Sequence, residues 1–184
     1  MRILWRVLLV FLITLVALWF CRSGVYRWAV HYRVIGQRTP ITTLTRSAAL
    51  AADLQGCIAS ALDTTAARLH FSTGRVSADP EALIRGGPAN CIGYTALCGS
   101  VLKGQLEAAG LGERYTVEAV LSKLYLGDID LHTFFTSPFW KDHDVVRIVD
   151  RSDGRVILLD PTLYDAIGIG QVESGAARTL TTHE

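Results

Sequence analysis

The chain opens with one long apolar run. Residues 7–20 are apolar apart from Thr14, and only Arg6 separates them from the apolar residues 3–5. A helix over residues 3–21 would have 19 positions, close to the ~20 that cross the hydrocarbon core of a bilayer. An arginine near a helix end can extend its guanidinium to the membrane interface. The pattern therefore predicts an N-terminal transmembrane helix that anchors a single-pass membrane protein.

The residues that flank this run argue against two other interpretations. A cleaved secretory signal shares the basic start and the apolar run, but it also needs small residues before the cleavage site. The run ends at residues 17–21 without an A-x-A pattern, which favours an uncleaved anchor. A buried core helix does not explain why Trp5, Trp19, Tyr26 and Trp28 bracket the run, as aromatic side chains do at membrane interfaces.

The segment after the apolar run mixes apolar and basic side chains. Residues 25–35 contain Arg27, His31 and Arg33 among valines, aromatics and an isoleucine. We expect a helix here that leaves the bilayer along its surface and that is broken at Thr39-Pro40.

This pattern divides the chain into two parts. Residues 1–35 form the anchor and juxtamembrane segment, and residues 36–184 form a single globular domain. The short N-terminal head favours a domain outside the cytosol, whereas the arginines on both sides of the run leave the membrane orientation open. The oligomeric state also stays open.

Two helices are expected in the first half of the globular domain. Residues 43–69 carry apolar side chains at three- to four-residue spacing, which predicts an amphipathic helix: Leu44, Ala48, Leu54, Cys57, Ile58 and Leu62. After a loop rich in Gly and Pro, a second helix is expected over residues 91–109. It would stop at Gly110, where a C-cap glycine is favoured.

The second half of the domain has strand patterns. Residues 115–121 alternate as a strand does, and residues 145–149 and 156–159 are short β-branched runs separated by the turn sequence 151–154. The chain from Gly168 onward resembles a loose tail. Helices followed by antiparallel strands indicate an α+β fold.

Composition and charge exclude several classes of protein. The 184 residues are 50% apolar and 19% charged, so the chain is not intrinsically disordered. The net charge of +1 argues against a nucleic-acid partner. That charge is uneven, because residues 1–35 hold five arginines and no acid, whereas the remainder holds 13 basic and 17 acidic side chains.

Cys91 is the candidate nucleophile. It follows the loop 86–90 and opens an apolar helix. A thiol at that position meets the unpaired N–H groups and the positive end of the helix dipole. Both features stabilise a thiolate, which is the form of cysteine that attacks carbonyl carbon.

His143 and Asp160 are the candidate partners of this thiol. His143 opens the first strand of the expected hairpin and Asp160 closes the second, so strand pairing places them side by side. An aspartate there can fix the tautomer of the imidazole, and the imidazole can activate the thiol.

These three motifs together resemble the transglutaminase-like superfamily. Its core often reads G-x-C-x-x-(Y/F)-A, H-A-W-V-x-V and D-P-T. This chain has Cys-Ile-Gly-Tyr-Thr-Ala at 91–96, His-Asp-Val-Val-Arg-Ile at 143–148 and Asp-Pro-Thr at 160–162. The order Cys, His, Asp and the spacings of 52 and 17 residues also agree with the family. The resemblance covers residues 84–165, about half the chain.

The resemblance implies a papain-like α+β core and a Cys-His-Asp triad. Carried over to this chain, Cys91 would be the nucleophile, His143 the general base and acid, and Asp160 the residue that orients the imidazole. Family members are amide hydrolases, peptidases and acyl or amine transferases that work through a thiol acyl-enzyme. The expected partner is therefore a peptide or another amide-bearing substrate, with hydrolysis favoured over transfer.

The chain departs from the family pattern next to the histidine. Asp144 replaces alanine and Val145 replaces tryptophan. Asp144 would raise the pKa of the His143 imidazole if it reached the ring, but strand alternation predicts that it points to the opposite face. The backbone N–H of Cys91 is one expected oxyanion donor, and Asn90 or Gln55 is a candidate for the second.

Two other functions are compatible with the sequence. Arg85-Gly86-Gly87 resembles the R-G-G-x-C motif of arylamine N-acetyltransferases, although three residues here separate the glycines from Cys91. Alternatively, the fold is a membrane-tethered binding or assembly module whose triad is idle.

The remaining candidate groups are less specific. Cys57 and Cys98 are either packed core or a disulfide of an exported domain. His132 is the alternative base. The adjacent residues Asp142, His143 and Asp144 cannot all face one ion from a strand, so no metal site is expected. The sequence has no phosphate-binding or dinucleotide motif, and we expect no cofactor.

The aromatic stretch of residues 121–140 precedes His143. It contains Tyr125, Phe134, Phe135 and Trp140, together with Phe139. It either covers the core or forms a lid or groove wall beside the thiol.

Overall fold

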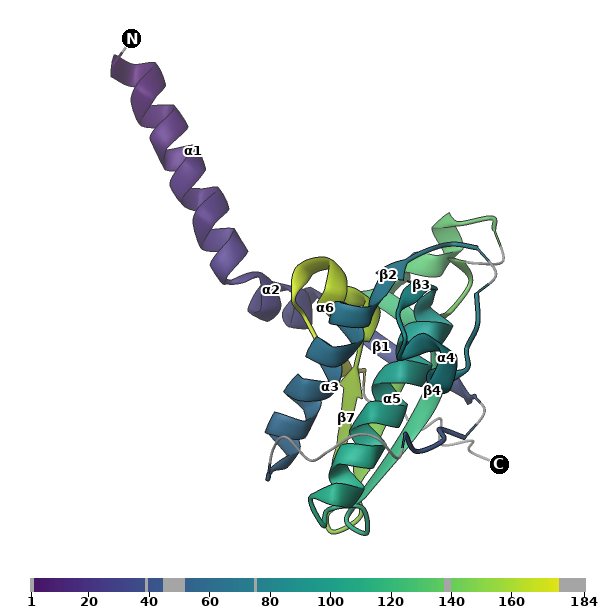
Figure 1. Cartoon of the computed structure of the whole chain (residues 1–184). Helices are drawn as coiled ribbons and strands as arrows, with labels where there is room; N and C mark the ends of the chain where they lie inside the picture. The colour runs from purple at the N-terminus through teal and green to yellow at the C-terminus, as the bar shows by residue number, and fades with distance from the viewer. Residues whose placement is uncertain (1, 39, 45–51, 75, 138–139, 176–184) are drawn as a thin grey trace, which may run out of the picture.

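Helices and strands form two packed layers in the body of the chain, with one long helix leaving it (Figure 1). The computed structural model describes residues 2–38, 40–44, 52–74, 76–137 and 140–175. Within these ranges the body combines helices with a six-stranded sheet and a two-stranded one, which confirms the predicted α+β class.

The large sheet closes on itself. Its strands are β1 (Val30–Gln37), β4 (Tyr115–Leu126), β5 (Ile129–Asp130), β6 (His143–Asp150), β7 (Val156–Leu159) and β8 (Gln171–Ser174). Their order is β1-β8-β7-β6-β4-β5, and β1 also pairs antiparallel with β4. The 12-residue β4 allows this closure, because its first part pairs with β6 and its second part with β1.

Two apolar clusters stabilise this arrangement. One cluster lies among the strands and includes Tyr32, Val145 and Leu158. The other lies between the sheet and the helices and includes Leu97 and Val146. Neighbouring residues of β6 therefore face different clusters, as expected for alternating strand side chains.

The helical layer contains α3 (Leu54–Arg68), α5 (Cys91–Ala108), α6 (Pro161–Ile167) and the short α4 (Pro80–Leu83). The small parallel sheet of β2 (Leu69–Phe71) and β3 (Gly87–Ala89) joins α3 to α5. Helix α5 confirms the predicted second helix. Gly110, with φ of +73°, lies just after it in the left-handed conformation that glycine adopts readily.

The predicted first helix of the body starts later than its apolar spacing suggested. Helix α3 begins at Leu54 because Asp53 caps it, accepting a hydrogen bond from the backbone N–H of Gly56 at 2.7 Å. Thr43 and Leu44 are not helical. Ala48, one of the apolar positions on which the prediction relied, lies outside the described residues.

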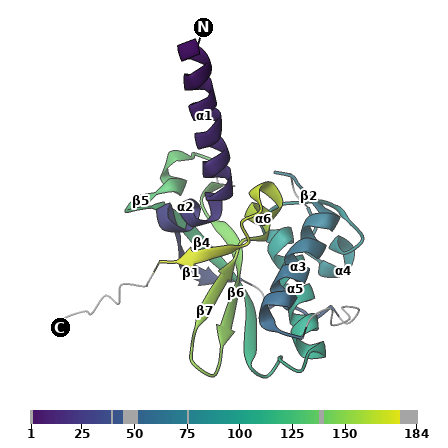
Figure 2. The ribbon, with the colours of Figure 1, turned by 90° about the vertical axis from the view of Figure 1, so that its left-hand side faces the viewer.

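The N-terminal run is helical but bent. Helix α1 (Arg2–Phe20) is followed by α2 (Arg22–Ala29), and Figure 2 shows α1 rising from one end of the body. In the described residues no single helix meets the length and hydropathy expected of a membrane span. Residues Trp5–Ala17 and Arg22–Ala29 meet them only as a pair, bent by 69°.

The predicted surface helix over residues 25–35 is wrong in its second half. The helix ends at Ala29, and the chain enters β1 at Val30 without a linker. Burial of Val30 and Tyr32 and exposure of Arg33 follow the two-residue period of a strand. The predicted domain boundary between residues 35 and 36 therefore falls inside a strand of the sheet. Thr39 of the predicted helix break lies outside the described residues.

The C-terminal prediction also needs correction. Helix α6 ends at Gly168, whose φ is +74°. The chain then forms β8 instead of a loose tail, pairing antiparallel with β7 and parallel with β1. The last residues of the predicted tail, 176–184, lie outside the described residues.

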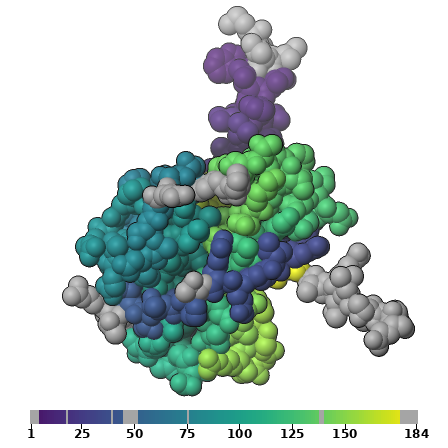
Figure 3. Space-filling view, turned by 90° about the vertical axis from the view of Figure 1, so that its right-hand side faces the viewer, coloured from purple at the N-terminus to yellow at the C-terminus, as the bar shows by residue number. Residues whose placement is uncertain are grey.

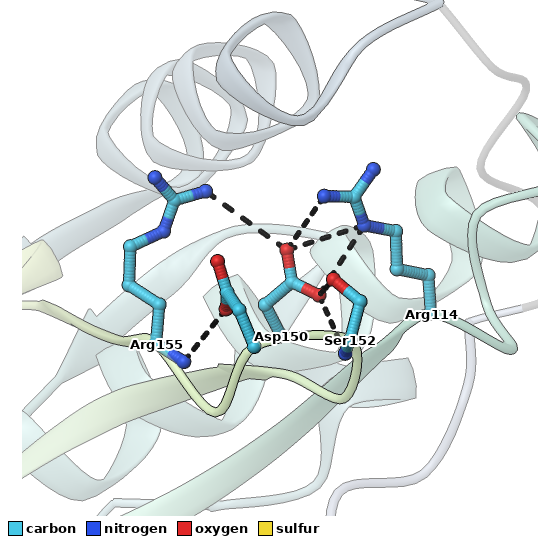
Figure 4. A network of polar contacts seen from close by, with 5 residues as sticks. Arg114, Asp150, Ser152 and Arg155 are labelled. Atoms are coloured by element: carbon cyan, nitrogen blue, oxygen red, sulfur yellow. Dashed lines mark hydrogen bonds and ion pairs between the residues drawn. The ribbon is translucent and has the colours of Figure 1, made fainter.

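The hairpin of β6 and β7 has the register that the sequence predicted. Val146 lies opposite Leu159, and Val149 lies opposite Val156. Asp150 anchors the turn, as Figure 4 shows. Its carboxylate accepts hydrogen bonds from Arg114 Nη2 at 2.8 Å and from the backbone N–H of Ser152 at 2.9 Å.

We expect Asp150→Asn to lower the thermal midpoint by several degrees at neutral pH, because Arg114 and Ser152 hold the pKa of this carboxyl well below its ordinary 3.8. A carboxyl whose pKa is lowered by folding stabilises the protein above its ordinary pKa, and that contribution is lost as the pH falls further. The difference between the wild type and Asp150→Asn should therefore shrink below pH 3.8. Thermal unfolding followed by circular dichroism measures it, with the exposed Asp128→Asn as control. An equal loss in both variants would contradict the prediction.

Candidate active site

The three predicted site residues each lie at the end of an element. Cys91 is the first residue of α5, His143 is the first residue of β6, and Asp160 is the N-cap of α6, directly after β7. The antiparallel hairpin brings the start of β6 to the end of β7. Helix α5 packs across the sheet with its N-terminus at the same edge.

The predicted contact between His143 and Asp160 is confirmed. Nε2 of the imidazole lies 2.8 Å from Oδ2 of Asp160. The other carboxylate oxygen, Oδ1, accepts a hydrogen bond from the backbone N–H of Leu163 at 2.9 Å, which caps α6. Asp160 is 1% exposed, so both hydrogen bonds form away from solvent.

Cys91 completes the chain of contacts. Its sulfur lies beside the imidazole of His143 in the wall of one pocket and helps to raise the pKa of that ring. Because Nε2 faces Asp160, Nδ1 is the ring nitrogen that remains for the sulfur. Asn90 precedes the cysteine as N-cap and accepts a hydrogen bond from the N–H of Gly93 at 3.3 Å. The thiol therefore lies at a helix N-terminus, as the sequence predicted.

Opposing influences act on the imidazole and the carboxylate. Burial lowers the pKa of His143, but the Asp160 charge and hydrogen bond, together with Cys91, outweigh it and raise the pKa to about 10. Burial likewise raises the pKa of Asp160, but the charge and hydrogen bond of His143 outweigh it and lower the pKa. The pair is therefore an imidazolium and a carboxylate at neutral pH.

Two tyrosines extend this hydrogen-bonded chain, and the sequence analysis did not identify their role. Tyr32 of β1 donates its hydroxyl hydrogen to Asp160 Oδ2 at 2.7 Å, and Tyr26 of α2 lies 2.8 Å from the Tyr32 hydroxyl. Because the single hydrogen of Tyr32 is used on Asp160, Tyr26 is the donor to Tyr32. Burial raises the pKa of both phenols, that of Tyr26 to about 12, so both stay protonated.

Besides His143, the Cys91 thiol has a second charged neighbour, the ion pair of Arg38 and Asp144. Oδ2 of Asp144 is 3.8 Å from the Cys91 sulfur, and Arg38 Nε donates to Asp144 Oδ1 at 2.6 Å. Asp144 is buried at 1% exposure, on the strand face that also carries Val146. As the strand alternation predicted, its charge is directed to Arg38 and not to the His143 ring. Arg38 was missed because nothing in the sequence links it to Asp144.

A pocket with a volume of about 320 Å³ opens beside the thiol. It is at the lower end of the ~300–1,000 Å³ typical of small-molecule sites. Besides Cys91, His143 and Asp160, its wall is mainly apolar and aromatic. The apolar and aromatic lining residues are Tyr26, Tyr32, Phe71, Leu124, Leu131, Phe135, Trp140, Leu163 and Ala166.

The aromatic stretch before His143 forms one wall of this pocket. The first residues of this stretch form the end of β4, which stops at Leu126. The chain then forms β5 and the 3₁₀ turn η1 (Leu131–Phe134). The pocket residues of this wall include Leu131 and Trp140. Phe139, named in the sequence analysis, lies outside the described residues.

The alternative base, His132, also lines the pocket but has another partner. Its Nδ1 lies 2.7 Å from the carbonyl oxygen of Trp140, so the ring proton is on Nδ1. Nε2 of the same ring is buried without a hydrogen-bond partner among the described residues. His143, and not His132, contacts Cys91 and Asp160.

Gln55 is not part of the site. Its side-chain oxygen accepts a hydrogen bond from Gln171 at 2.7 Å, and it lines a different pocket, beside the end of α6. Asn90 uses its side-chain oxygen as the cap of α5. Of the two candidates for the second oxyanion donor, Gln55 is therefore removed, and the role of Asn90 stays a prediction.

The other buried cysteines do not form the disulfide that the sequence left open. Cys57 and Cys98 are thiols in the helical layer. Burial raises the pKa of both, that of Cys98 to about 12. Cys21 is the exposed thiol among the described residues.

Within the described ranges, no cluster of three or more His, Cys, Asp or Glu side chains could hold a metal ion. Comparisons of the chain with protein-family models, curated proteins and solved structures found no match.

Proposed function

We propose that the chain is a membrane-anchored cysteine enzyme with a transglutaminase-like, papain-like core that acts on amide-linked acyl groups. The observation that carries the proposal is the 2.8 Å contact of His143 with Asp160 in the wall of the pocket that Cys91 also lines. The raised pKa of His143 supports it, because an imidazolium beside the sulfur can give its proton to the leaving amine.

The proposed first step is acylation of the sulfur. The Cys91 thiolate attacks the carbonyl carbon of the amide and forms the C–S bond. The imidazolium of His143 gives its proton to the leaving amine nitrogen as the C–N bond breaks. Backbone N–H groups at the start of α5, that of Cys91 first, would stabilise the negative charge that develops on the carbonyl oxygen.

Hydrolysis of the thioester completes the cycle. Neutral His143 takes a proton from water while the water oxygen attacks the thioester carbon. The C–S bond then breaks, which releases a carboxylic acid and restores the thiolate and the imidazolium. Asp160 keeps the imidazole oriented in both steps through the 2.8 Å contact with Nε2.

The membrane anchor is part of the same proposal. The side chains of α1 that face outward are apolar, among them Val10, Phe11 and Leu12. Exposed apolar side chains over this length are typical of a helix that lies in lipid. Helix α1 leaves the body at one end and has its apolar faces uncovered (Figure 1).

The test locates the acyl group. The full chain in detergent micelles is incubated with p-nitroanilide and p-nitrophenyl acyl donors, and peptides are mapped by mass spectrometry. We expect a thioester on Cys91, together with release of the chromophore. Cys91→Ala should lose both, whereas Cys21→Ala, which removes the exposed thiol, should keep both.

The outcomes separate the rival functions. Turnover that persists in Cys91→Ala would overturn the proposal. Wild-type protein that forms no thioester with either donor would favour the binding or assembly module. A thioester that is discharged to an added arylamine but not to water would favour the acyltransferase.

A further inference from the structure

The pocket beside Cys91 lies at the end of the body from which α1 leaves. Its walls include residues of α2, β2 and α6, together with Leu131, His132, Phe135 and Trp140. Figures 1 and 2 show α2 and α6 close to the base of α1, with β2 at the same end of the body. In the space-filling view, a green part of the chain lies at the top of the body, the end from which α1 rises (Figure 3).

The elements around this pocket expose large apolar side chains, and we call this surface the rim. Phe71, Phe135 and Trp140 are exposed and line the pocket itself. Outside the pocket, on α2, η1 and α6, the exposed residues are Val25, Trp28, Phe134 and Ile167, of which Trp28 is 88% and Phe134 71% exposed. Several aromatic side chains exposed at one end of a body are unusual for a surface in water and are typical of a membrane interface.

The two sides of Cys91 differ in polarity. The pocket on one side is lined mainly by apolar and aromatic side chains, and the carboxylate of Asp142 in its wall lies 3.8 Å from Arg38 Nη2. On the other side stand the charges of Asp144 and Arg38. A molecule that spans the thiol would therefore place an apolar part toward the pocket and a polar part toward Arg38.

The pocket wall also holds unsatisfied polar atoms. Nε2 of His132 and Oγ1 of Thr162 are buried without hydrogen-bond partners among the described residues. Nδ1 of His132 faces the carbonyl oxygen of Trp140, so in the neutral ring Nε2 is the acceptor. An amide N–H is a donor that could satisfy it.

We propose that this pocket takes the apolar chain of an amphiphilic amide that is presented at the bilayer surface. The inference rests on the proposed amide chemistry of Cys91, and it specifies the class of substrate: an acyl chain in the pocket and a polar head on the Arg38 side. The rim of α2, η1 and α6 meets the lipid interface, so the substrate passes from the bilayer to the thiol without crossing water.

The first experiment measures occupancy of the pocket without turnover. Cys91 of the full chain in micelles is alkylated with iodoacetamide in the presence of acetamide, butanamide, hexanamide or octanamide. Burial of a methylene group is worth about a fourfold gain in affinity. We expect half-protection of Cys91 to need a concentration up to about fourfold lower for each added methylene. Alkylation of exposed Cys21 in the same sample should not change, which excludes loss of reagent into micelles.

A matched pair of variants locates the chain. Ala166 and Ala78 are both exposed alanines, the first lining this pocket and the second lining the pocket that contains Arg38. In Ala166→Trp an indole fills the apolar pocket, and protection by octanamide should weaken about tenfold or more. In Ala78→Trp protection by octanamide should be unchanged. Equal protection by all four amides, or an equal loss in both variants, would overturn the proposal.

The second experiment tests the membrane-facing rim. In the full chain with Trp5, Trp19 and Trp28 replaced by Phe, Trp140 is the one remaining tryptophan. In phosphatidylcholine vesicles that contain brominated lipid, its fluorescence should be quenched. Absence of quenching would overturn the proposal that this rim meets the lipid interface.

These results are distinguishable from failure of the proposed function. Protection that grows with chain length, without a thioester on Cys91, would leave the pocket assignment intact and remove the catalytic proposal. A thioester that forms equally fast with short and long acyl donors would leave the catalytic proposal intact and remove the pocket assignment.

Discussion

Asp160→Asn should slow the alkylation of Cys91 about a hundredfold at neutral pH. The Asp160 charge is the largest influence that raises the pKa of His143, to about 10. Without it, burial lowers the pKa of the imidazole, which becomes neutral at pH 7 and no longer stabilises a thiolate. Asparagine is the appropriate replacement because it can still cap α6, where Asp160 accepts the N–H of Leu163.

The pH dependence is the sharper part of this prediction. A raised pKa means that His143 in the wild type stays protonated from acid pH up to about 10. The gap between wild type and Asp160→Asn should therefore be large at neutral pH, and it should narrow as the pH rises through ~8.5, where a thiol ionises without an imidazolium beside it. Rates of iodoacetamide labelling at each cysteine, read by peptide mass spectrometry, measure this gap.

Two controls belong to the experiment. Asp165→Asn removes a carboxylate of the same helix, one that bonds Tyr94 at 2.5 Å, and it should leave the labelling of Cys91 unchanged. Cys98, whose pKa burial raises to about 12, should stay unlabelled while the chain is folded. A Cys91 that reacts equally fast in wild type and Asp160→Asn at neutral pH, with Cys98 protected, would contradict an imidazolium-activated thiol.

Arg38→Met should destabilise the fold and also slow the labelling of Cys91. It leaves the 1% exposed Asp144 carboxylate without its 2.6 Å partner and 3.8 Å from the sulfur. Removing one partner of a fully buried pair costs ~3–5 kcal/mol. Because the Arg38 side chain is 39% exposed, water screens the pair and we expect about 1–3 kcal/mol. The uncompensated charge should also repel a thiolate and slow labelling about tenfold.

The double variant Arg38→Met/Asp144→Asn separates charge from packing. Removing the carboxylate as well as the guanidinium eliminates the unpaired charge, so stability and labelling should both return toward the wild-type values. Urea unfolding measures the free energy of unfolding, and peptide mass spectrometry measures the labelling rate. A double variant as impaired as Arg38→Met would show that the loss comes from packing and not from the charge.

The contact of His143 with Asp160 was predictable because it depends on local pairing. A hairpin with a four-residue turn fixes which residues lie opposite each other, and the two strands were evident as β-branched runs. Helix α5 was equally clear, with Asn90 as its cap and Gly110 after its last turn. These features need only sequence neighbours.

The parts that sequence reasoning missed depend on contacts between distant segments. Arg38 meets Asp144 across 106 positions of chain, and Tyr32 meets Asp160 across 128. No spacing rule predicts such pairs. Strand β1 was interpreted as helix because its arginines and aromatics follow an apolar run, although Val30, Tyr32 and Val34 alternate with more polar positions. Its burial comes from β4 and β8, which the sequence alone does not place beside it.

The direct passage from α2 into β1 has a practical consequence for producing the domain. Ala29 ends the helix and Val30 begins the strand, so the anchor and the sheet share one uninterrupted backbone. A truncated chain that starts at residue 36 would lose most of β1, including the tyrosine that holds Asp160. It would open the closed sheet and expose the edges of β4 and β8, which promotes aggregation. A soluble form of the domain therefore has to keep Val30, and a protease that releases the domain from its anchor would have to cut before it.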